Sequence, residues 1–559
     1  MGLRLPCIFL FLAITLAVGC SGVARPSSSN RPSATEATTN VPVDVVTAAH
    51  AHYAAAIVQE LSGNPDLALE EFKQAALLDP GNETLALEVS QRLVARKKLE
   101  EALEVLLKAS KQPEASGAIF NHIGYLCVRL DRMEEAMAAN KQAIKRSPTV
   151  LAGYQNLYLN YMQKGQRAEA YKVLEQAAKA SAADADFLVN LAELFANFGR
   201  QTPSQKSTAY AAAVKLLNQA LTKAPLPPEL ELKAADGFNL LNKDAKAKEI
   251  YLKLLSQPDK LPQAISAIRV RLADIYLREG DRQRAVEQLQ AVLVDDPANL
   301  AVNLQLGSLA QDEKRFQLAA DCFRKVVLLR PEIEPPYYEL AQAQLSLDEP
   351  HEALETLAQA RAQFAESYVG ELLAGIACGR LNDLTNAIAH FAAAEVFGNA
   401  STPSRLNGMF YYQFGALCES SGDTVQAEKL MLKSLELSPN YAEAQNFLGY
   451  LWAEHGTNLP VARQLIEKAV QTDPDNPAYL DSLAWVLFKQ GLANEALPHM
   501  LKAVELTEKP EAVMYDHLGD IHFALKQDKK AREAWQKSLS LESNEAVRKK
   551  LISMPAASH

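Results

Sequence analysis

Several kinds of residue are scarce in this 559-residue sequence, and each scarcity excludes a class of protein. Glycine (24) and proline (27) are few while apolar residues make up 48%, which excludes a disordered or fibrous chain. Charge of one sign is not in strong excess, because the net charge is only -10. Both signs are mixed along the chain, which argues against a general binder of the nucleic-acid backbone. The length favours several domains or one extended array over a single core.

Long apolar runs are also missing, with one exception near the start. This run extends from Cys7 to Val18, which is too short for a stable membrane span but has the length of the apolar region of a secretory signal peptide. Its end, LAVGC, resembles a bacterial lipobox, although Ala17 stands where leucine is commonest. We therefore expect residues 1–20 to be a lipoprotein signal peptide and Cys20 to be lipidated. An ordinary cleaved signal peptide is the alternative.

The lipobox resemblance implies a location. A lipidated Cys20 would anchor the protein at the cell envelope, and Ser21 after it implies the outer membrane, facing the periplasm. Residues 21–45 form the expected flexible tether, because Ser, Thr, Pro and Asn dominate residues 21–40 and large apolar side chains are almost absent there.

From residue 49 onward, one period organises the chain. An alanine recurs at Ala68, Ala102, Ala136, Ala170, Ala213, Ala247, Ala285, Ala319, Ala353, Ala387, Ala427, Ala462, Ala496 and Ala531. Eight of the thirteen intervals are 34 residues, and chance does not hold such a register over fourteen units. A small residue often stands twelve positions before the alanine, as Gly124 and Gly519 do, and a proline often stands twelve after it, as Pro80 and Pro297 do.

Each unit is typical of two amphipathic helices, for example AYLDSLAWVLFKQG and LANEALPHMLKAVEL, with a glycine closing the first. Small residues allow the two helices to cross closely, and proline ends the second. One pair alone leaves an apolar face in water, so consecutive pairs must stack. These positions resemble those of the tetratricopeptide repeat over nearly all of the mature chain. The resemblance implies an all-α solenoid over residues 46–545, a right-handed superhelix of about fourteen helix–turn–helix units.

The period breaks near residues 200–210, 257–263 and 399–406, where we expect long turns. Residues 546–559 contain AVRKKLISM, which we expect to form a cap helix followed by a tail, with Leu551 and Met554 turned inward.

Reactive side chains are scarce outside the repeat pattern. Beyond the leader there are four cysteines, which we expect to be buried free thiols: Cys127, Cys322, Cys378 and Cys418. Asp516 and Asp520 would share a helix face, but His522 would point away from them, so we expect no metal site. We find no glycine-rich phosphate loop, nucleophile elbow or catalytic carboxylate pair outside the repeat register. The sequence therefore predicts no enzyme and no cofactor.

The first helices of tetratricopeptide arrays line a concave groove, so the resemblance also implies candidate binding residues. In the last three repeats these are Asn446, Tyr450, Asp481, Trp485, Phe488, Asp516, Asp520 and Phe523. Aromatic anchors beside a few polar groups suit a peptide or protein partner, and the acidic residues suit a basic or amine-bearing one. Alternatively, Trp485 and Phe488 pack against a neighbouring helix or the cap, and the sequence leaves both possibilities open.

A second strip nearer the N-terminus is almost neutral, and we interpret it as a solvated face. It consists of Asn121, Tyr125, Arg129, Gln155, Leu159 and Gln163.

Together these patterns predict a non-enzymatic protein–protein interaction scaffold, lipid-anchored at the bacterial cell envelope, that binds peptide or protein partners in its groove. The alternative is an accessory or regulatory subunit of an envelope assembly, secretion or polysaccharide-export machine. The expected partners are proteins or peptides, with the membrane contacted through the anchor, and neither nucleic acid nor a small-molecule substrate is expected.

Overall fold

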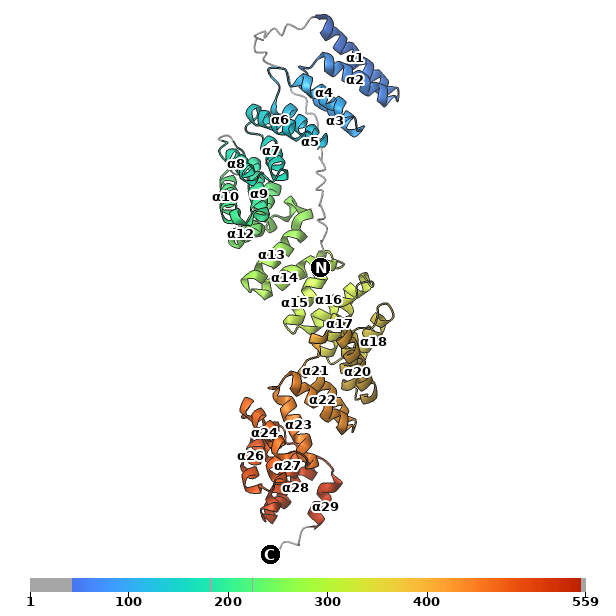
Figure 1. The fold of residues 1–559 in the computed structure, drawn as a ribbon, viewed down its shortest axis with the longest axis vertical. Helices are drawn as coiled ribbons and strands as arrows, with labels where there is room; N and C mark the ends of the chain where they lie inside the picture. The colour runs from blue at the N-terminus through green and yellow to red at the C-terminus, as the bar shows by residue number, and fades with distance from the viewer. Residues whose placement is uncertain (1–42, 181–182, 224, 554–559) are drawn as a thin grey trace. The chain divides into compact units, whose positions relative to one another are not determined.

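The computed structural model describes residues 43–180, 183–223 and 225–553 (Figure 1). The chain divides into two compact units, the first ending at Leu226 and the second beginning at Pro227. Within the described ranges all regular structure is helical, consisting of twenty-nine α-helices and four short 3-10 helices. None of these helices is both long and apolar enough to cross a bilayer.

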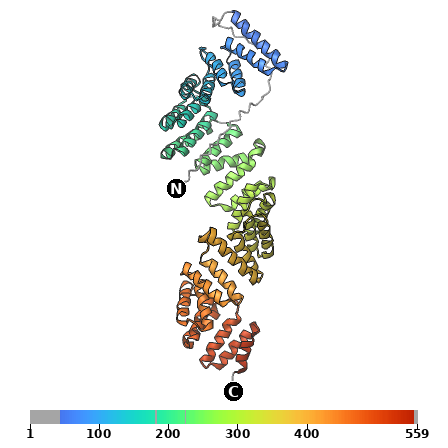
Figure 2. The ribbon, with the colours of Figure 1, turned by 45° about the vertical axis from the view of Figure 1, so that its right-hand side comes forward.

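Unit 1 consists of five helical hairpins, in which each odd-numbered helix pairs with the helix that follows it (Figure 2). Its helices are α1 (Val43–Leu61), α2 (Pro65–Leu78), α3 (Glu83–Ala95), α4 (Leu99–Ala109), α5 (Gly117–Arg129), α6 (Met133–Arg146), α7 (Leu151–Gln163), α8 (Arg167–Ala177), α9 (Ala185–Gln201) and α10 (Lys206–Leu221).

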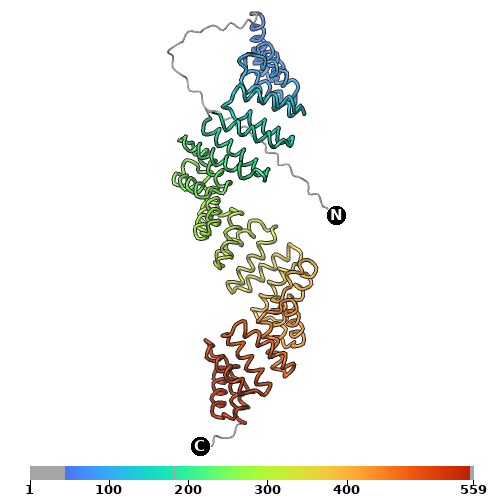
Figure 3. Tube along the Cα trace, turned by 60° about the vertical axis from the view of Figure 1, so that its left-hand side comes forward, coloured from blue at the N-terminus to red at the C-terminus, as the bar shows by residue number. Residues whose placement is uncertain are grey.

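Unit 2 continues the pattern with nine hairpins and one further helix, α29 (Glu545–Ser553). The hairpin helices are α11 (Pro228–Leu240), α12 (Asp244–Leu255), α13 (Ile265–Glu279), α14 (Arg282–Asp295), α15 (Leu300–Asp312), α16 (Phe316–Leu329), α17 (Pro335–Ser346), α18 (Pro350–Arg361), α19 (Tyr368–Arg380), α20 (Leu384–Ser401), α21 (Gly408–Ser420), α22 (Thr424–Leu437), α23 (Ala442–His455), α24 (Leu459–Thr472), α25 (Pro477–Lys489), α26 (Ala493–Leu506), α27 (Ala512–Ala524) and α28 (Asp528–Leu541). The chain trace zigzags through successive hairpins within each unit (Figure 3).

The predicted all-α solenoid is confirmed, with five hairpins in one unit and nine in the other, which makes fourteen. The alanine that marks the period lies on the second helix of every hairpin and is at most 1% exposed in all fourteen. Its burial reflects close helix crossing. At Gly519 of α27, for example, a Cβ atom would lie 2.4 Å from Cδ1 of Trp535 on α28. Small residues at these positions therefore set the distance between the two helices of a hairpin.

Most first helices are followed by a residue whose backbone is in the left-handed conformation, with a positive φ, and this residue turns the chain back into the second helix. Glycine occupies this position at Gly491, with φ of 81°, but Asp131 occupies it in unit 1 with φ of 60°. Asn, Asp and Lys thus replace the glycine of the sequence pattern in several hairpins.

The insertions are mostly helical and do not form the long turns that we expected. In the first insertion, α9 and α10 reach 17 and 16 residues and are joined by the short helix η1 (Pro203–Gln205). The second contains η2 (Pro258–Lys260) and η3 (Pro262–Ala264). In the third, α20 extends to 18 residues and is followed by η4 (Pro403–Arg405). Good helix formers such as alanine flank the first and third insertions, which favours continuation of the helix.

Candidate functional site

The predicted groove residues lie on three neighbouring first helices, α23, α25 and α27, which contact one another in that order. Six of these residues form two rows, in which successive members are 35 residues apart in the sequence. The first row is Asn446, Asp481 and Asp516, and the second row is Tyr450, Trp485 and Asp520. Rows arise because equivalent positions of stacked repeats face the same side.

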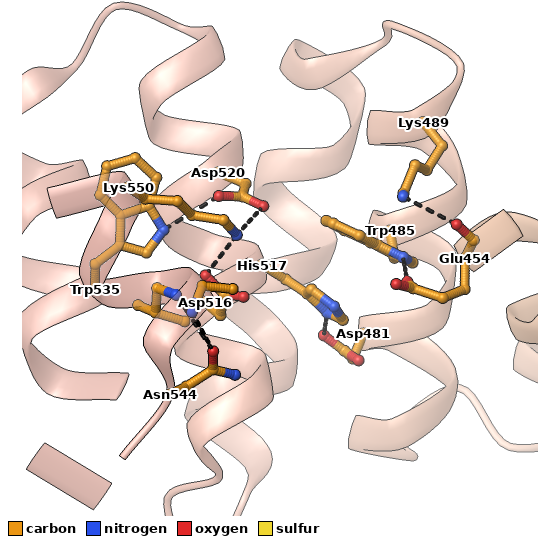
Figure 4. A network of polar contacts seen from close by, with 12 residues as sticks. Glu454, Asp481, Trp485, Lys489, Asp516, His517, Asp520, Trp535, Asn544 and Lys550 are labelled. Carbon is orange, nitrogen blue, oxygen red and sulfur yellow. Dashed lines mark hydrogen bonds and ion pairs between the residues drawn. The ribbon is translucent and has the colours of Figure 1, made fainter. Parts of the chain in front are cut away.

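Trp485 is packed within this face rather than open on it. Its side chain is 6% exposed, and its Nε1 donates a hydrogen bond of 2.7 Å to Oε2 of Glu454 on α23 (Figure 4). The ring of His517, from α27, stacks on the indole with centroids 3.8 Å apart and an interplanar angle of 18°. The ammonium of Lys489 lies 4.5 Å from the ring centroid. Trp485 therefore joins three consecutive first helices.

Asp481 and His517 form a buried pair between α25 and α27. The two residues are 6% and 4% exposed, and His517 Nδ1 lies 2.9 Å from Oδ1 of Asp481 (Figure 4). The sequence predicted Asp481 as a groove residue but did not single out His517 as its partner. Their separation of 36 positions in the sequence differs from the 35-residue row spacing, so position in the repeat gave no signal.

Asp516 and Asp520 both bind Lys550 of α29, whose Nζ lies 2.7 Å from a carboxylate oxygen of each (Figure 4). Nε1 of Trp535 donates a further hydrogen bond of 3.1 Å to Asp520. Burial raises the pKa of Asp520, and the hydrogen bond and charge of Lys550 oppose that rise. Burial alone would lower the pKa of Lys550, but the two aspartates outweigh it, so that pKa is raised. Lys550 is not among the residues predicted from the sequence, although its 34-residue separation from Asp516 equals the repeat period.

Of the remaining predicted residues, Asn446, Tyr450 and Phe488 are partly buried and Phe523 is exposed. Burial raises the pKa of the Tyr450 phenol, as do nearby carboxylates, of which Glu454 contributes most. The amide oxygen of Asn446 is buried without a hydrogen-bond partner. Phe488 is half-buried and stacks on Trp485 at 5.2 Å, whereas Phe523 is 48% exposed and has Trp535 on one side at 5.6 Å.

The second strip, on α5 and α7 of unit 1, is far more open. Tyr125 and Leu159 are 46% and 49% exposed. Arg129, one turn along the same helix, donates a 2.8 Å hydrogen bond to the Tyr125 hydroxyl. Neither aromatic nor acidic side chains accumulate there, as expected for a solvated face.

The predicted cysteine state is confirmed for the four cysteines within the described ranges, all of which are free and buried. Burial raises the pKa of Cys322 and that of Cys418 to about 11, which makes both poor nucleophiles. Cys20, the predicted lipidation site, lies outside the described residues, as does Met554 of the predicted cap.

Ser482, which lies beside Asp481 on α25, is 3% exposed and donates its hydroxyl proton to the carbonyl oxygen of Ala478 in its own helix. Across the described part of the chain, no three His, Cys, Asp or Glu side chains are grouped to hold a metal ion. The site therefore offers charge, aromatic surface and hydrogen bonds for recognition.

Models of the tetratricopeptide repeat family match residues 118–150, which form α5 and α6, and residues 270–332, which cover α13 to α16. The TPR repeat-containing protein PA4667 of Pseudomonas aeruginosa is 35% identical over 118 residues, covering 21% of this chain and 19% of that protein. The type IV pilus assembly protein PilF of the same organism is 29% identical over 136 residues, covering 24% and 54%. The chain thus spans about a fifth and about half of these relatives.

A BBSome complex member BBS4 homolog of Drosophila melanogaster is 21% identical over 71% of this chain and 73% of that protein. Among solved structures, the APC/C hetero-tetramer Cut9–Hcn1 covers 80% of this chain and 91% of that chain, with 16% identity and a TM-score of 0.33. The matches to the repeat family fall in both units, and the chain therefore contains tetratricopeptide repeats in each of them.

Proposed function

We propose that this protein is a non-enzymatic scaffold that binds protein or peptide partners on the face formed by α23, α25 and α27. Tetratricopeptide repeats generally serve as protein-interaction units, and stacked repeats present their first helices as one continuous surface. The observation that carries the proposal is the pair of rows on this face, where acidic, amide and aromatic side chains recur at 35-residue spacing. A rigid surface of this kind reduces the ordering cost of binding.

The buried members of the rows support the proposal by holding the face in shape. Trp485 and the Asp481–His517 pair tie the three helices together, so the exposed groups around them stay in fixed positions. The surface available to a partner then includes the exposed Glu443 of α23, the exposed Glu454, one oxygen of which accepts the hydrogen bond from Trp485, and the exposed ring of Phe523.

The charge of this surface favours a basic partner. Lys550 gives an internal example, because its ammonium is held by two carboxylates of the face at 2.7 Å. A lysine or arginine of a partner would pair in the same way with Glu443 or Glu454, and an apolar side chain would pack on Phe523. Charge pairing of this kind adds specificity and a faster association rate more than raw affinity.

We further propose that lipidation of Cys20 anchors the scaffold at the cell envelope, with the Ser/Thr/Pro-rich residues 21–42 as a tether that is shorter than the predicted 21–45, because α1 begins at Val43. Cys20→Ala is then expected to move the protein from the membrane fraction to the soluble fraction of fractionated cells. Continued tight membrane association of that variant would contradict the lipid anchor.

Photo-crosslinking in intact cells tests the binding face directly. A photoreactive residue at Phe523 is expected to give discrete adducts with one or a few partners, and Glu443→Lys is expected to remove most of them. The matched control is the same photoreactive residue at Val425 of α22, which is 80% exposed on a second helix. Equal adducts from both positions would refute the proposed face.

The partial likeness to a pilus assembly protein favours a second candidate, an accessory subunit with one obligate partner in an envelope machine. Copurification in mild detergent separates the two. A single partner at fixed stoichiometry supports the subunit, whereas several partners at variable stoichiometry support the general scaffold.

A further inference from the structure

A cavity of about 610 Å³ lies in unit 2 between the second helices α16 and α18, on helices other than those of the proposed binding face. Its size is within the range of ligand pockets in proteins. The intervening helix α17 contacts both α16 and α18 and supplies the floor through Tyr337, Leu340 and Gln344, which are at most 4% exposed. The walls come from residues of α16 and α18 that are largely open to solvent.

The floor of this cavity contains a polar pair that the neighbouring hairpin lacks. Thr356 of α18 donates a 2.9 Å hydrogen bond to Oε1 of Gln344 of α17, and the two residues are 6% and 4% exposed. In the preceding hairpin the same repeat positions hold Ala310 and Cys322, which are 0% and 3% exposed. Burial of an amide lowers stability unless its hydrogen bonds are satisfied. Since the preceding hairpin packs without an amide there, packing alone does not account for Gln344.

One edge of the Gln344 amide is unused. Its Nε2 has no hydrogen-bond partner among the described residues, although the side chain is almost fully buried at the cavity floor. Nε2 of Gln363, which also lines the cavity, donates a 3.0 Å hydrogen bond to the Tyr337 hydroxyl. This leaves Oε1 of Gln363 as an acceptor with no partner in the described part of the chain. The cavity thus presents a free donor and a free acceptor, and a peptide unit carries the complementary pair.

We propose that this cavity binds an extended segment of a partner protein, with a backbone carbonyl of the segment accepting a hydrogen bond from Nε2 of Gln344. The segment is extended because carbonyl groups inside a helix are already bonded within that helix. An aliphatic side chain of the segment packs on Leu328, which is 81% exposed, and on the half-buried Val327 beside it. The site is separate from the face of α23, α25 and α27 and does not depend on whether that face binds a partner.

The charge of the lining selects the kind of segment. Glu352 and Glu355 of α18 are exposed and form no ion pair with any described residue. Arg324 is the one cation among the described residues that line the cavity, and it is already paired with Asp321 at 2.9 Å. The charge that remains is negative, so the segment carries a lysine or arginine beside its aliphatic residue. Nucleic acid, with its phosphate charges, is disfavoured for the same reason.

Binding of defined peptides to the full-length protein in mild detergent tests the proposal. An array of capped pentapeptides varies the central residue among alanine, leucine and glutamate, and the flanking residues among alanine, lysine and glutamate. We expect the tightest binding for a leucine flanked by lysines. Basic peptides could also bind the face of α23, α25 and α27, so the array is repeated with Glu443→Lys. That variant alters the face and is expected to leave binding at the cavity unchanged.

The double variant Gln344→Met with Thr356→Val removes the polar pair but keeps the approximate size of both side chains. It is expected to weaken binding of the leucine–lysine peptides by about tenfold, since the peptide carbonyl loses its donor. The melting temperature is expected to stay the same or rise, because a buried polar pair is exchanged for apolar groups of similar shape. A merely structural role of the pair would not give a loss of binding without a loss of stability.

Gln342→Met is the matched control, because Gln342 is an exposed glutamine on the same helix that does not line the cavity. It should change neither peptide binding nor the melting temperature. Peptide binding that the double variant leaves unchanged, an array with no binding peptide, or a preference for glutamate flanks would each overturn the proposal. Self-association of the protein that the double variant abolishes would assign the cavity to a second copy of the chain and would overturn it as well.

Discussion

The same repeat position has different surroundings in the two units. Trp485 in unit 2 and Tyr125 in unit 1 each follow the small residue that precedes the repeat alanine by twelve positions. Trp485 is 6% exposed and is held by Glu454 and His517 from the two adjacent first helices. Tyr125 is 46% exposed, and its hydroxyl binds Arg129 of its own helix.

The difference shows that the repeat fixes a side chain's direction while the neighbouring repeat decides its burial. On α27 the residue fourteen positions before the alanine is His517, whose ring covers Trp485. On α7 the equivalent residue is Asn156, which has no ring to stack on Tyr125. Differences at neighbouring repeat positions, such as His517 against Asn156, thus accompany the difference between a packed face and a solvated one.

The largest expected effect comes from removing the packed ring. Trp485→Ala is expected to destabilise the C-terminal hairpins by about 3–5 kcal/mol, because it opens a cavity between α23, α25 and α27. Tyr125→Ala is expected to cost less than about 0.5 kcal/mol, since the ring is largely solvated. Hydrogen exchange of the backbone amides of α5, α25 and α27 measures both effects locally, which suits an array whose parts open separately.

Trp485→Phe is the matched control, because it keeps an aromatic ring against His517 but removes the hydrogen bond to Glu454. It is expected to cost about 1–2 kcal/mol. If Trp485→Ala left exchange in α25 and α27 unchanged while reducing partner capture, Trp485 would be a contact residue and the comparison with Tyr125 would fail.

A smaller effect is expected at two glycines, Gly124, which precedes Tyr125, and Gly519, which holds the same repeat position in the hairpin that follows Trp485. A Cβ atom at Gly519 would lie 2.4 Å from two atoms of the Trp535 indole, a rigid ring. At Gly124 it would lie 2.4 Å from the amide oxygen of Asn140, a smaller side chain that can rotate. Gly519→Ala is therefore expected to cost about 1–3 kcal/mol through overpacking.

At Gly124 the gain of about 1 kcal/mol in helix propensity largely offsets the strain that the added Cβ atom causes. Gly124→Ala is therefore expected to leave the free energy of unfolding almost unchanged. Urea denaturation followed by circular dichroism compares the two variants with wild type. Equal destabilisation would mean that the interior of unit 1 is as rigid as that of unit 2.

The sequence predicted the repeat architecture well because packing inside one hairpin recurs in every unit. All fourteen periodic alanines are buried, and the hairpin count follows from them. The predicted groove residues lie on three neighbouring first helices, but the sequence left the packing of Trp485 open. Contacts such as Asp481–His517 join adjacent repeats through residues that do not recur, so periodicity carries no information about them.

The smallest expected effect concerns the cap. Lys550→Met leaves Asp516 and Asp520 without their cation and is expected to cost roughly 1–2 kcal/mol at neutral pH. The pKa of Asp520 is already raised above 3.8 by burial, and loss of Lys550 raises it further. Between 3.8 and the raised pKa the folded state binds more protons than the unfolded state, so stability increases as pH falls through that window. The deficit of Lys550→Met should therefore shrink on acidification, as measured by denaturation with tryptophan fluorescence. Lys549 is an exposed neighbour on the same helix, so Lys549→Met should show neither the loss of stability nor its pH dependence. If the loss of stability in Lys550→Met did not change with pH, Asp520 would be excluded as its source.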